Sequence, residues 1–339
     1  MAYGGIPKKT GETVPEDGPH PGTMGFQEWF SHFNYFDRSK RGIGGLFHNG
    51  TAVDPVDGEP CTMLMDRALP WMRKQAAAGQ PFFVCIWFPH PHRPHRPMEE
   101  SIPDGPEDRR HRALMGEMVE VDRQVGRLRE VLRAWGIADD TLVWFTSDNG
   151  VLEEGTTDDG LTGHKGDLWE GGIRVPAIVE WPRHVRPQRI EDVPASTMDN
   201  LPTLLDILGL PTPVRPIDGH SLWPLLSDGE TGERPPIPFW RVLRKHAMPP
   251  HNATQAAGYQ DSHAVLIHGR FKLHRNPWQV GGSKKERRLD GVDWVLYDVI
   301  ADPAEEHDLL EQQPAVAAAM QRLLLEWQSS ATASMMGGL

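Results

Sequence analysis

Two continuous apolar runs of strand length flank one long amphipathic helix, and this order most constrains the fold. The runs cover residues 82–88 and 141–146, and neither alternates between apolar and polar residues. Such runs are typical of strands that are buried on both faces of a parallel sheet. Between them, apolar residues recur at helical steps of three and four, at Leu114, Met118, Val121, Val125, Leu128 and Leu132. The sequence therefore predicts a right-handed βαβ unit and an α/β fold.

Later segments predict a second, smaller unit. The remaining expected elements are a strand over 175–181, a short helix over 199–209, a hairpin over 263–274, a strand over 293–298 and a terminal helix over 314–329. We therefore expect an α/β domain over residues 1–225 and a C-terminal antiparallel-sheet subdomain with a terminal helix over residues 226–339.

The composition excludes several classes of partner. The formal net charge is −12, and such a surface gives no basis for binding nucleic acid, which depends on Lys and Arg. No stretch approaches the roughly 18 consecutive apolar residues of a membrane-spanning helix. The N-terminus lacks the apolar core of a signal peptide, so the chain as written is expected to be cytoplasmic. Its oligomeric state stays open.

The two cysteines lie in different contexts. Cys85 belongs to the first apolar run and is expected to be a buried thiol, whereas Cys61 lies in a polar stretch. Two cysteines placed so differently do not predict a disulfide.

Polar loops follow both apolar runs, at the edge where open α/β sheets bind ligands. Asp148 and Asn149 follow the second run, and their side-chain oxygens suit a hard cation, although Asp-Asn-Gly is also a common turn. Farther on, Lys165 lies between glycines that would let a ligand approach the backbone closely. A solvated loop lysine is the alternative interpretation.

The loop after the first run is rich in proline and histidine, and it contains His90, His92 and His95. Three neighbouring imidazoles could bind a transition metal, or act as general acids or anion contacts. A surface loop without a function is the third interpretation.

Several motifs together resemble the type I sulfatase family, which is arylsulfatase-like and part of the alkaline-phosphatase superfamily. They are the segments 141–150, 163–166, 170–176, 82–94, 199–209, 218–222 and 296–303. The resemblance implies a mostly parallel sheet sandwiched by helices, with a small C-terminal α+β subdomain. It also implies the hydrolysis of sulfate monoesters.

The resemblance also implies roles for individual residues. Asp148 and Asn149 would bind a divalent cation, Ca²⁺ with Mg²⁺ as the alternative. Lys165 and His92 would contact the sulfate as catalytic residues. His164 stands where the family commonly has glycine, and it is a further candidate for substrate binding. His90 and His95 are the remaining candidates from the histidine loop.

Part of the family pattern is missing from the sequence. The family nucleophile is a formylglycine made from the Cys or Ser of a Cys/Ser-x-Pro/Ala-x-Arg motif, and neither Cys61 nor Cys85 has that context. The N-terminal Asp-Asp metal pair and a Lys-Trp-His motif are also missing. Asp158 and Asp159 could add metal ligands, but their loop matches no family motif. We therefore expect a chain that begins just after the Lys-Trp-His motif, lacks N-terminal strands and shows no useful activity alone.

Three interpretations of function remain open. The first is a sulfatase acting on an aryl or carbohydrate sulfate, from a family that is often periplasmic, secreted or lysosomal. The second is a non-catalytic remnant that binds sulfated glycan or a partner chain. The third is a phosphatase or phosphonate hydrolase of the same superfamily. Substrate choice would depend on loops such as 156–163 and 246–260, and their sequence does not identify the ester.

Overall fold

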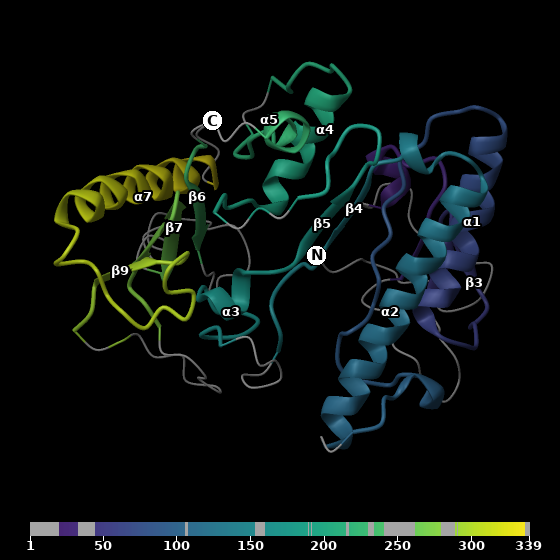
Figure 1. Ribbon diagram of the computed structural model, residues 1–339, viewed down its shortest axis with the longest axis horizontal. Coiled ribbons are helices and arrows are strands. Elements are labelled where there is room, and N and C mark those ends of the chain that lie inside the picture. The colour runs from purple at the N-terminus through teal and green to yellow at the C-terminus, as the bar shows by residue number, and fades with distance from the viewer. Residues whose placement is uncertain are drawn as a thin grey trace. The chain divides into compact units, whose positions relative to one another are not determined.

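A computed structural model shows the chain as two compact units, Met1–Thr141 and Leu142–Leu339, which are described one at a time (Figure 1). The structure describes residues 20–32, 45–105, 108–152, 160–188, 190, 192–214, 217–229, 234–240, 262–278, 289 and 291–335.

The first unit begins with a short 3-10 helix, η1 (Pro21–Met24), and a small antiparallel sheet. Its strands are, in order across the sheet, β1 (Phe30–His32), β2 (Leu46–His48) and β3 (Thr51–Val53). Leu46 and Phe47 on the central strand are buried, and Leu46 packs against Met63 of the following helix. The sheet therefore shares its core with that helix.

Helix α1 (Pro60–Ala77) begins with a well-defined cap. The Glu59 carboxylate accepts hydrogen bonds from the N–H groups of Cys61 and Thr62, both at 2.6 Å, and Pro60 fits the first helical turn. Buried residues then recur at helical spacing, at Cys61, Met63, Met65, Leu69 and Met72. Cys61 is therefore a core residue at the start of α1, although its sequence neighbours are polar.

The predicted helix over 114–132 is confirmed as α2 (Arg109–Ala134), which begins at the cap residue Asp108 and lies beside α1 in Figure 1. Its buried face differs from the predicted one. Met118 is 43% exposed, whereas Glu117, Glu120 and Gln124 are buried. Val121 and Leu132 of the predicted stripe are buried and Met118 is not. The buried polar side chains were not predicted, because they are buried with partners from other segments. Two further short 3-10 helices, η2 (Glu99–Ser101) and η3 (Ala138–Asp140), flank α2.

The predicted strand over 82–88 does not form. This run is extended but pairs with no described strand, and its side chains alternate between half-buried and exposed. Phe83 is 60% exposed and Trp87 is 82% exposed. Cys85, which was expected to be buried, is exposed as well. An apolar run is buried on both faces only where neighbouring strands and helices cover it, and the described residues provide no such neighbours here.

In the second unit, β4 (Val143–Thr146) and β5 (Ala177–Glu180) confirm the strands predicted at 141–146 and 175–181. They pair antiparallel, with Val143 opposite Glu180 and Thr146 opposite Ala177. Every pair of strands among the described residues is antiparallel, so the predicted parallel βαβ pairing is not formed there. The short helix α3 (Glu170–Ile173) immediately precedes β5.

A turn of 3-10 helix, η4 (Thr197–Asp199), leads into α4 (Asn200–Ile207), and α5 (Trp223–Asp228) follows. Asp199 occupies the N-cap position of α4, as predicted, but its side chain does not cap that helix. The buried carboxylate instead pairs with both terminal nitrogens of Arg234, at 2.8 and 2.9 Å, and accepts the N–H of His220. Asp199 therefore joins α4 to two later segments.

The C-terminal elements agree with the sequence. Strands β6 (Ile237–Trp240), β7 (Ala264–His268), β8 (Phe271–Arg275) and β9 (Trp294–Asp298) form one antiparallel sheet. Helix α7 (Pro314–Met335) crosses this sheet in Figure 1, and Met320 and Leu324 enter a core with Leu266, Leu273 and Leu296. These elements all lie beyond residue 225, and the domain boundary expected there stays a prediction.

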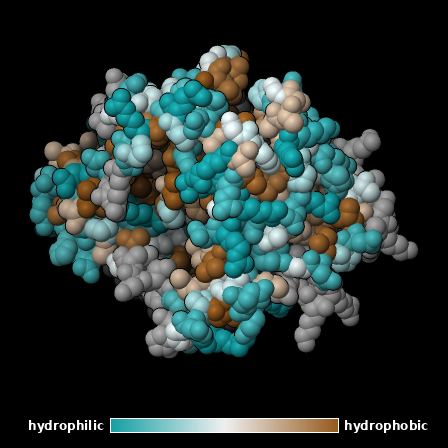
Figure 2. Space-filling view, turned by 45° about the vertical axis from the view of Figure 1, so that its right-hand side comes forward, coloured by the Kyte–Doolittle hydropathy of each residue, from teal (hydrophilic) through white to brown (hydrophobic). Residues whose placement is uncertain are grey.

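The surface is mostly polar. On the face shown in Figure 2, hydrophobic residues are scattered among hydrophilic ones. No helix in the described part of the chain is long and apolar enough to cross a membrane.

Candidate functional site

The Asp148-Asn149 turn and the Lys165 loop lie side by side in the second unit, joined by their backbones. The N–H of Gly150 donates to the carbonyl oxygen of Gly172 at 3.0 Å, and the N–H of Lys165 donates to the carbonyl oxygen of Val151 at 2.5 Å. Both candidate segments thus belong to one local structure at the end of β4, where the sequence analysis expected a site.

Three glycines make this close packing possible. A Cβ atom on Gly150 would overlap the carbonyl oxygen of Gly171, and one on Gly171 would overlap that of Gly163. A Cβ on Gly172 would overlap the carbonyl oxygen of Asp167. Any larger residue at these positions would push the two loops apart.

The candidate side chains on these loops differ in exposure. Asp148 is exposed, while Asn149 and Lys165 are partly buried. Neither the Asp148 carboxylate nor the Lys165 ammonium forms an ion pair with another described residue. The His164 ring lies against its own loop, with Nδ1 3.0 Å from the carbonyl oxygen of Lys165. The loops therefore present an acid, an amide and an ammonium on adjacent segments.

A buried charge network holds α3, which follows the Lys165 loop, to the C-terminal sheet. Lys272 on β8 is fully buried, and its Nζ lies 2.9 Å from Glu170 Oε1 and 3.0 Å from Glu305 Oε1. Glu305 Oε2 also accepts the N–H of Glu170 at 2.6 Å. A second link joins the Thr162 hydroxyl to the carbonyl oxygen of Ala304 at 2.6 Å. Lys272 of the sheet and the segment that follows β9 therefore hold the residues on both sides of the Lys165 loop.

Two buried histidines continue this network. His274 Nε2 lies 2.7 Å from Glu305 Oε1, and His263 Nε2 lies 3.1 Å from His274 Nδ1. Burial, and then the charge of Lys272, lowers the pKa of His274 well below its usual value. Burial also raises the pKa of Glu305. A neutral His274 is thus built into the support of the loop.

The sequence analysis did not assign these supporting residues a role. The lysine within the predicted hairpin over 263–274 could have indicated a buried ion pair. A lysine in a buried strand needs a paired carboxylate, since Lys is almost never fully buried unless it is paired. Glu170 and Glu305 belong to or adjoin motifs that carry the family resemblance, but their pairing through Lys272 is a tertiary contact across about a hundred residues of sequence.

His92 lies in the first unit and is exposed. Its Nδ1 is 2.6 Å from the carbonyl oxygen of Arg93. Because a carbonyl oxygen only accepts, Nδ1 of His92 carries the proton of this hydrogen bond. Its convergence with Asp148, Asn149 and Lys165, which lie in the second unit, stays a prediction.

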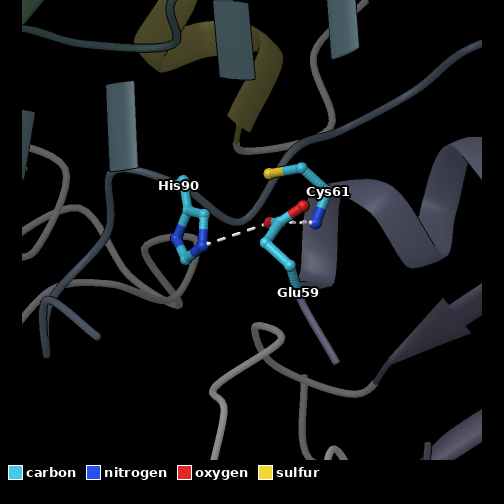
Figure 3. A group of neighbouring side chains, drawn as sticks. All are labelled: Glu59, Cys61 and His90. Carbon is cyan, nitrogen blue, oxygen red and sulfur yellow. Dashed lines mark hydrogen bonds and ion pairs between the residues drawn. The ribbon is translucent and has the colours of Figure 1, made fainter. Parts of the chain in front are cut away.

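His90 and His95 face buried carboxylates. His95 Nδ1 lies 2.8 Å from Glu117 Oε2, and the His90 ring lies among the carboxylates of Glu59, Glu117 and Glu120 (Figure 3 shows Glu59). Although burial lowers the pKa of His90, contacts with Glu120 and Glu59 outweigh burial and raise it to about 9. Neither histidine has the exposure of His92.

The described metal donors fit a hard cation only in part. Asp148 and Asn149 offer side-chain oxygens of the kind that Ca²⁺ and Mg²⁺ prefer, but Ca²⁺ takes about six to eight oxygens. Asp158 and Asp159, the other proposed donors, lie outside the described residues, as do most of the substrate loops proposed at 156–163 and 246–260.

Comparison with known proteins points to one family. The sequence model of the Sulfatase family matches residues 6–210. The chain is 38% identical to mouse (Mus musculus) steryl-sulfatase over 186 residues, which cover 52% of this chain and 29% of that protein. It is 31% identical to pig (Sus scrofa) N-acetylgalactosamine-6-sulfatase over 238 residues, which cover 64% of this chain and 45% of that protein. The chain thus spans less than half the length of these two relatives.

Solved structures agree. A crystal structure of Ps i-CgsB in complex with k-i-k-neocarrahexaose matches 93% of this chain and 70% of its own, with a TM-score of 0.75 and 25% identity. The PsFucS1 sulfatase from Pseudoalteromonas sp. matches 87% of this chain and 59% of its own, with a TM-score of 0.70 and 21% identity. These likenesses confirm the predicted alkaline-phosphatase-like α/β class. With the family match over residues 6–210, they show that the chain belongs to the type I sulfatase family.

Proposed function

We propose that this chain serves the hydrolysis of a sulfate monoester. Lys165 and His92 would contact the sulfate, and Asp148 and Asn149 would supply part of a divalent-cation site. The observation that carries the proposal is the backbone clamp between the two loops, in which Gly150 bonds Gly172 and Lys165 bonds Val151. This clamp holds the backbone of the Lys165 loop beside the Asp148-Asn149 turn, which supports a site where an ammonium and a cation held by the two oxygen donors would bind one sulfate.

Each side chain would have a distinct task. Asp148 and Asn149 would hold the cation through their oxygens, and the bound cation, Ca²⁺ with Mg²⁺ as the alternative, would supply positive charge against the sulfate oxygens. The Lys165 ammonium would bind a further sulfate oxygen. His92 would deliver a proton from Nε2 to the departing alcohol oxygen.

The proposed substrate is a sulfated carbohydrate, with aryl sulfates as simpler reporters. Support comes from the Ps i-CgsB structure, whose bound ligand is a neocarrahexaose, and from relatives that are N-acetylgalactosamine-6-sulfatases. Because the chain is also similar to steryl-sulfatase, other sulfate esters are candidate substrates as well.

We further propose that the 339-residue chain by itself does not turn over substrate. Neither cysteine has the sequence context of the formylglycine motif, and Cys61 is fully buried. Burial, and then the neighbouring Glu59, raises the pKa of the Cys61 thiol, which disfavours the thiolate. Binding of sulfated glycan without turnover is therefore the second candidate function for this polypeptide.

The test compares this chain with the same chain joined to any coding sequence that precedes it in frame, using a fluorogenic aryl sulfate and a sulfated oligosaccharide. We expect no turnover by the chain alone. We expect Ca²⁺-dependent turnover by a longer polypeptide that carries the nucleophile motif, reduced at least about 100-fold by Lys165→Ala or His92→Ala. Lys74→Ala, at an exposed lysine on α1, is the matched control.

Two results would contradict the proposal. The first is robust hydrolysis by the 339-residue chain that Lys165→Ala abolishes, because it would mean that a nucleophile is present here. The second is a preference of the longer polypeptide for phosphate or phosphonate esters, which would favour the phosphatase interpretation.

A further inference from the structure

A second set of metal-ligand side chains lies in the first unit, apart from Asp148 and Asn149. Glu59, Cys61 and His90 each direct one ligand atom, an oxygen, the sulfur and a ring nitrogen, to within 4.8 Å of the others. Figure 3 shows the Glu59 carboxylate between the start of α1 and the His90 ring. The Cys61 sulfur points to the side of Cys61 on which His90 lies. Cys61 is fully buried, and the side chains of Glu59 and His90 are 8% and 6% exposed.

Glu120 on α2 is a candidate fourth ligand, because it adjoins this set on the side of His90. Its Oε2 lies 3.1 Å from His90 Nε2, and Glu59 Oε1 lies 3.5 Å from the same nitrogen. Two ligands on a tetrahedral ion with bonds of roughly 2.0–2.1 Å are about 3.3–3.4 Å apart. Both contacts of His90 Nε2 have separations close to this value, so this nitrogen lies at the spacing of a neighbouring ligand from each carboxylate.

Two of these atoms, His90 Nε2 and Glu120 Oε2, face each other as an ion pair at 3.1 Å but do not form a hydrogen bond. His90 Nε2 and Glu120 Oε2 are buried, and neither has a hydrogen-bond partner among the described residues, although they are close together. Buried polar atoms are nearly always hydrogen-bonded. A buried nitrogen and a buried carboxylate oxygen without hydrogen bonds, beside a second carboxylate and a thiol, are the kind of donor set that a shared cation would satisfy.

The surroundings orient these ligands in the way that metal sites require. The N–H of Met98 donates to Glu120 Oε1 at 2.6 Å, which leaves Oε2 to face His90. On the other side of the ring, His90 Nδ1 lies 3.5 Å from Glu117 Oε1. A histidine that binds a metal usually presents its second nitrogen to a carboxylate in this manner. Glu117 is held in turn by His95 Nδ1 at 2.8 Å.

We propose that Glu59, Cys61, His90 and Glu120 bind one Zn²⁺ ion in a closed, structural site. Thiolate and imidazole ligands favour zinc over Ca²⁺ or Mg²⁺, so this site differs in chemistry from the one proposed at Asp148. The ligands come from the start of α1, from the histidine loop and from α2. Bound zinc would tie these three segments together, including the segment that carries His92.

Charge balance is consistent with this assignment. Three buried carboxylates, those of Glu59, Glu117 and Glu120, lie around the His90 ring, and such a cluster favours a cation. Binding of Zn²⁺ would release one proton from His90 and one from Cys61, so the total charge of the cluster would stay the same.

The test uses the full chain after dialysis against a chelator, titrated with Zn²⁺ and, for spectroscopy, with Co²⁺. We expect one tightly bound Zn²⁺ per chain. We also expect a Co²⁺ spectrum with the intense visible bands of tetrahedral coordination and a near-ultraviolet thiolate-to-metal band. Cys61→Ser should remove the thiolate band and weaken zinc binding at least about 100-fold. Cys85→Ser, which changes the other and exposed cysteine, should leave both unchanged.

Several outcomes would overturn the site. They are a chain that binds no stoichiometric zinc, a Co²⁺ complex without a thiolate band, and a Cys61→Ser chain that binds zinc like the unsubstituted one. If circular dichroism shows that Cys61→Ser is unfolded, the Co²⁺ spectrum of the unsubstituted chain and the zinc affinity of Glu120→Gln decide instead. Asp148→Asn should leave zinc binding unchanged, which separates this test from that of the sulfatase proposal.

Discussion

The N–H of Gly150 donates a hydrogen bond to the carbonyl oxygen of Gly172 at 3.0 Å, and this contact ties the Asp148-Asn149 turn to α3. The two segments are twenty-two residues apart in sequence, and they approach so closely only because no Cβ stands between them. The relationship explains why both segments are rich in glycine, and it can be tested by adding a single methyl group.

Gly150→Ala should destabilise the chain. The new Cβ would overlap the Gly171 carbonyl oxygen, and overpacking of this kind costs about 1–3 kcal/mol, or more where the contact is with backbone. Chemical denaturation would measure the loss. Gly126→Ala is the control, because that glycine lies in α2 with no atom within 4 Å of a new Cβ. It should be neutral or stabilising by about 0.5–1 kcal/mol. Equal effects of the two substitutions would contradict the clamp.

Lys272→Met should be strongly destabilising. It would leave Glu170 and Glu305 buried without their shared cation, and breaking a buried ion pair costs about 3–5 kcal/mol. Arg270→Met is the matched control on the same hairpin, because the Arg270–Asp298 pair is half exposed and should contribute at most about 1 kcal/mol. Urea denaturation of both variants would show whether loss of the buried pair lowers the free energy of unfolding more. Similar denaturation midpoints would contradict this prediction.

The stability of the chain should fall with acid because of His274. Its pKa in the folded chain is far below 6.5, so the unfolded chain takes up a proton first as the pH drops. The free energy of unfolding contributed by the neutral His274 is fully present above pH 6.5. Below that pH it is lost at up to about 1.4 kcal/mol per pH unit. His274→Gln should lack this part of the slope between pH 6.5 and 5, while Lys272, Glu305 and His263 stay in place. Identical slopes would mean that His274 titrates normally.

Ca²⁺ should change the melting temperature of this chain very little. A complete site at 100 times its Kd would add about 2.7 kcal/mol of stability. Among the described residues, the proposed ligands are Asp148 and Asn149, and two residues would supply only a minority of the about six to eight oxygens that Ca²⁺ prefers. A melting curve with and without Ca²⁺ measures the effect, and Asp148→Asn is the control. A large shift that this substitution removes would show that a complete cation site exists in this chain.

The C-terminal unit could be predicted from local patterns. The hairpin with its turn at Gly269, the strand β9 and helix α7 all follow from spacing and turn residues. Their partners are near in sequence, so alternation and helical period fix the buried face. The same holds for the Asp148-Asn149 turn at the end of β4.

Other features depend on tertiary contacts that spacing does not encode. The apolar run 82–88 has a strand-like composition, but pairing requires neighbouring strands. On α2, Glu117 and Glu120 are buried because His90, His95 and the backbone of residues 96–98 meet them. Burial of a carboxylate depends on its partner, and no single segment contains both.

The sheet formed by β6 to β9 and the segment after it affect where along the sequence harmful substitutions would be found. Glu305 and Ala304, in the segment that follows β9, hold the segment that carries Lys165. If Lys165 contacts sulfate as proposed, changes in the last third of the chain would impair sulfate binding without touching sulfate. A random screen for loss of function should therefore find substitutions in the C-terminal region that look like active-site mutations. The C-terminal region then supports the loop that carries Lys165, and a transfer of that loop to another protein would need this support as well.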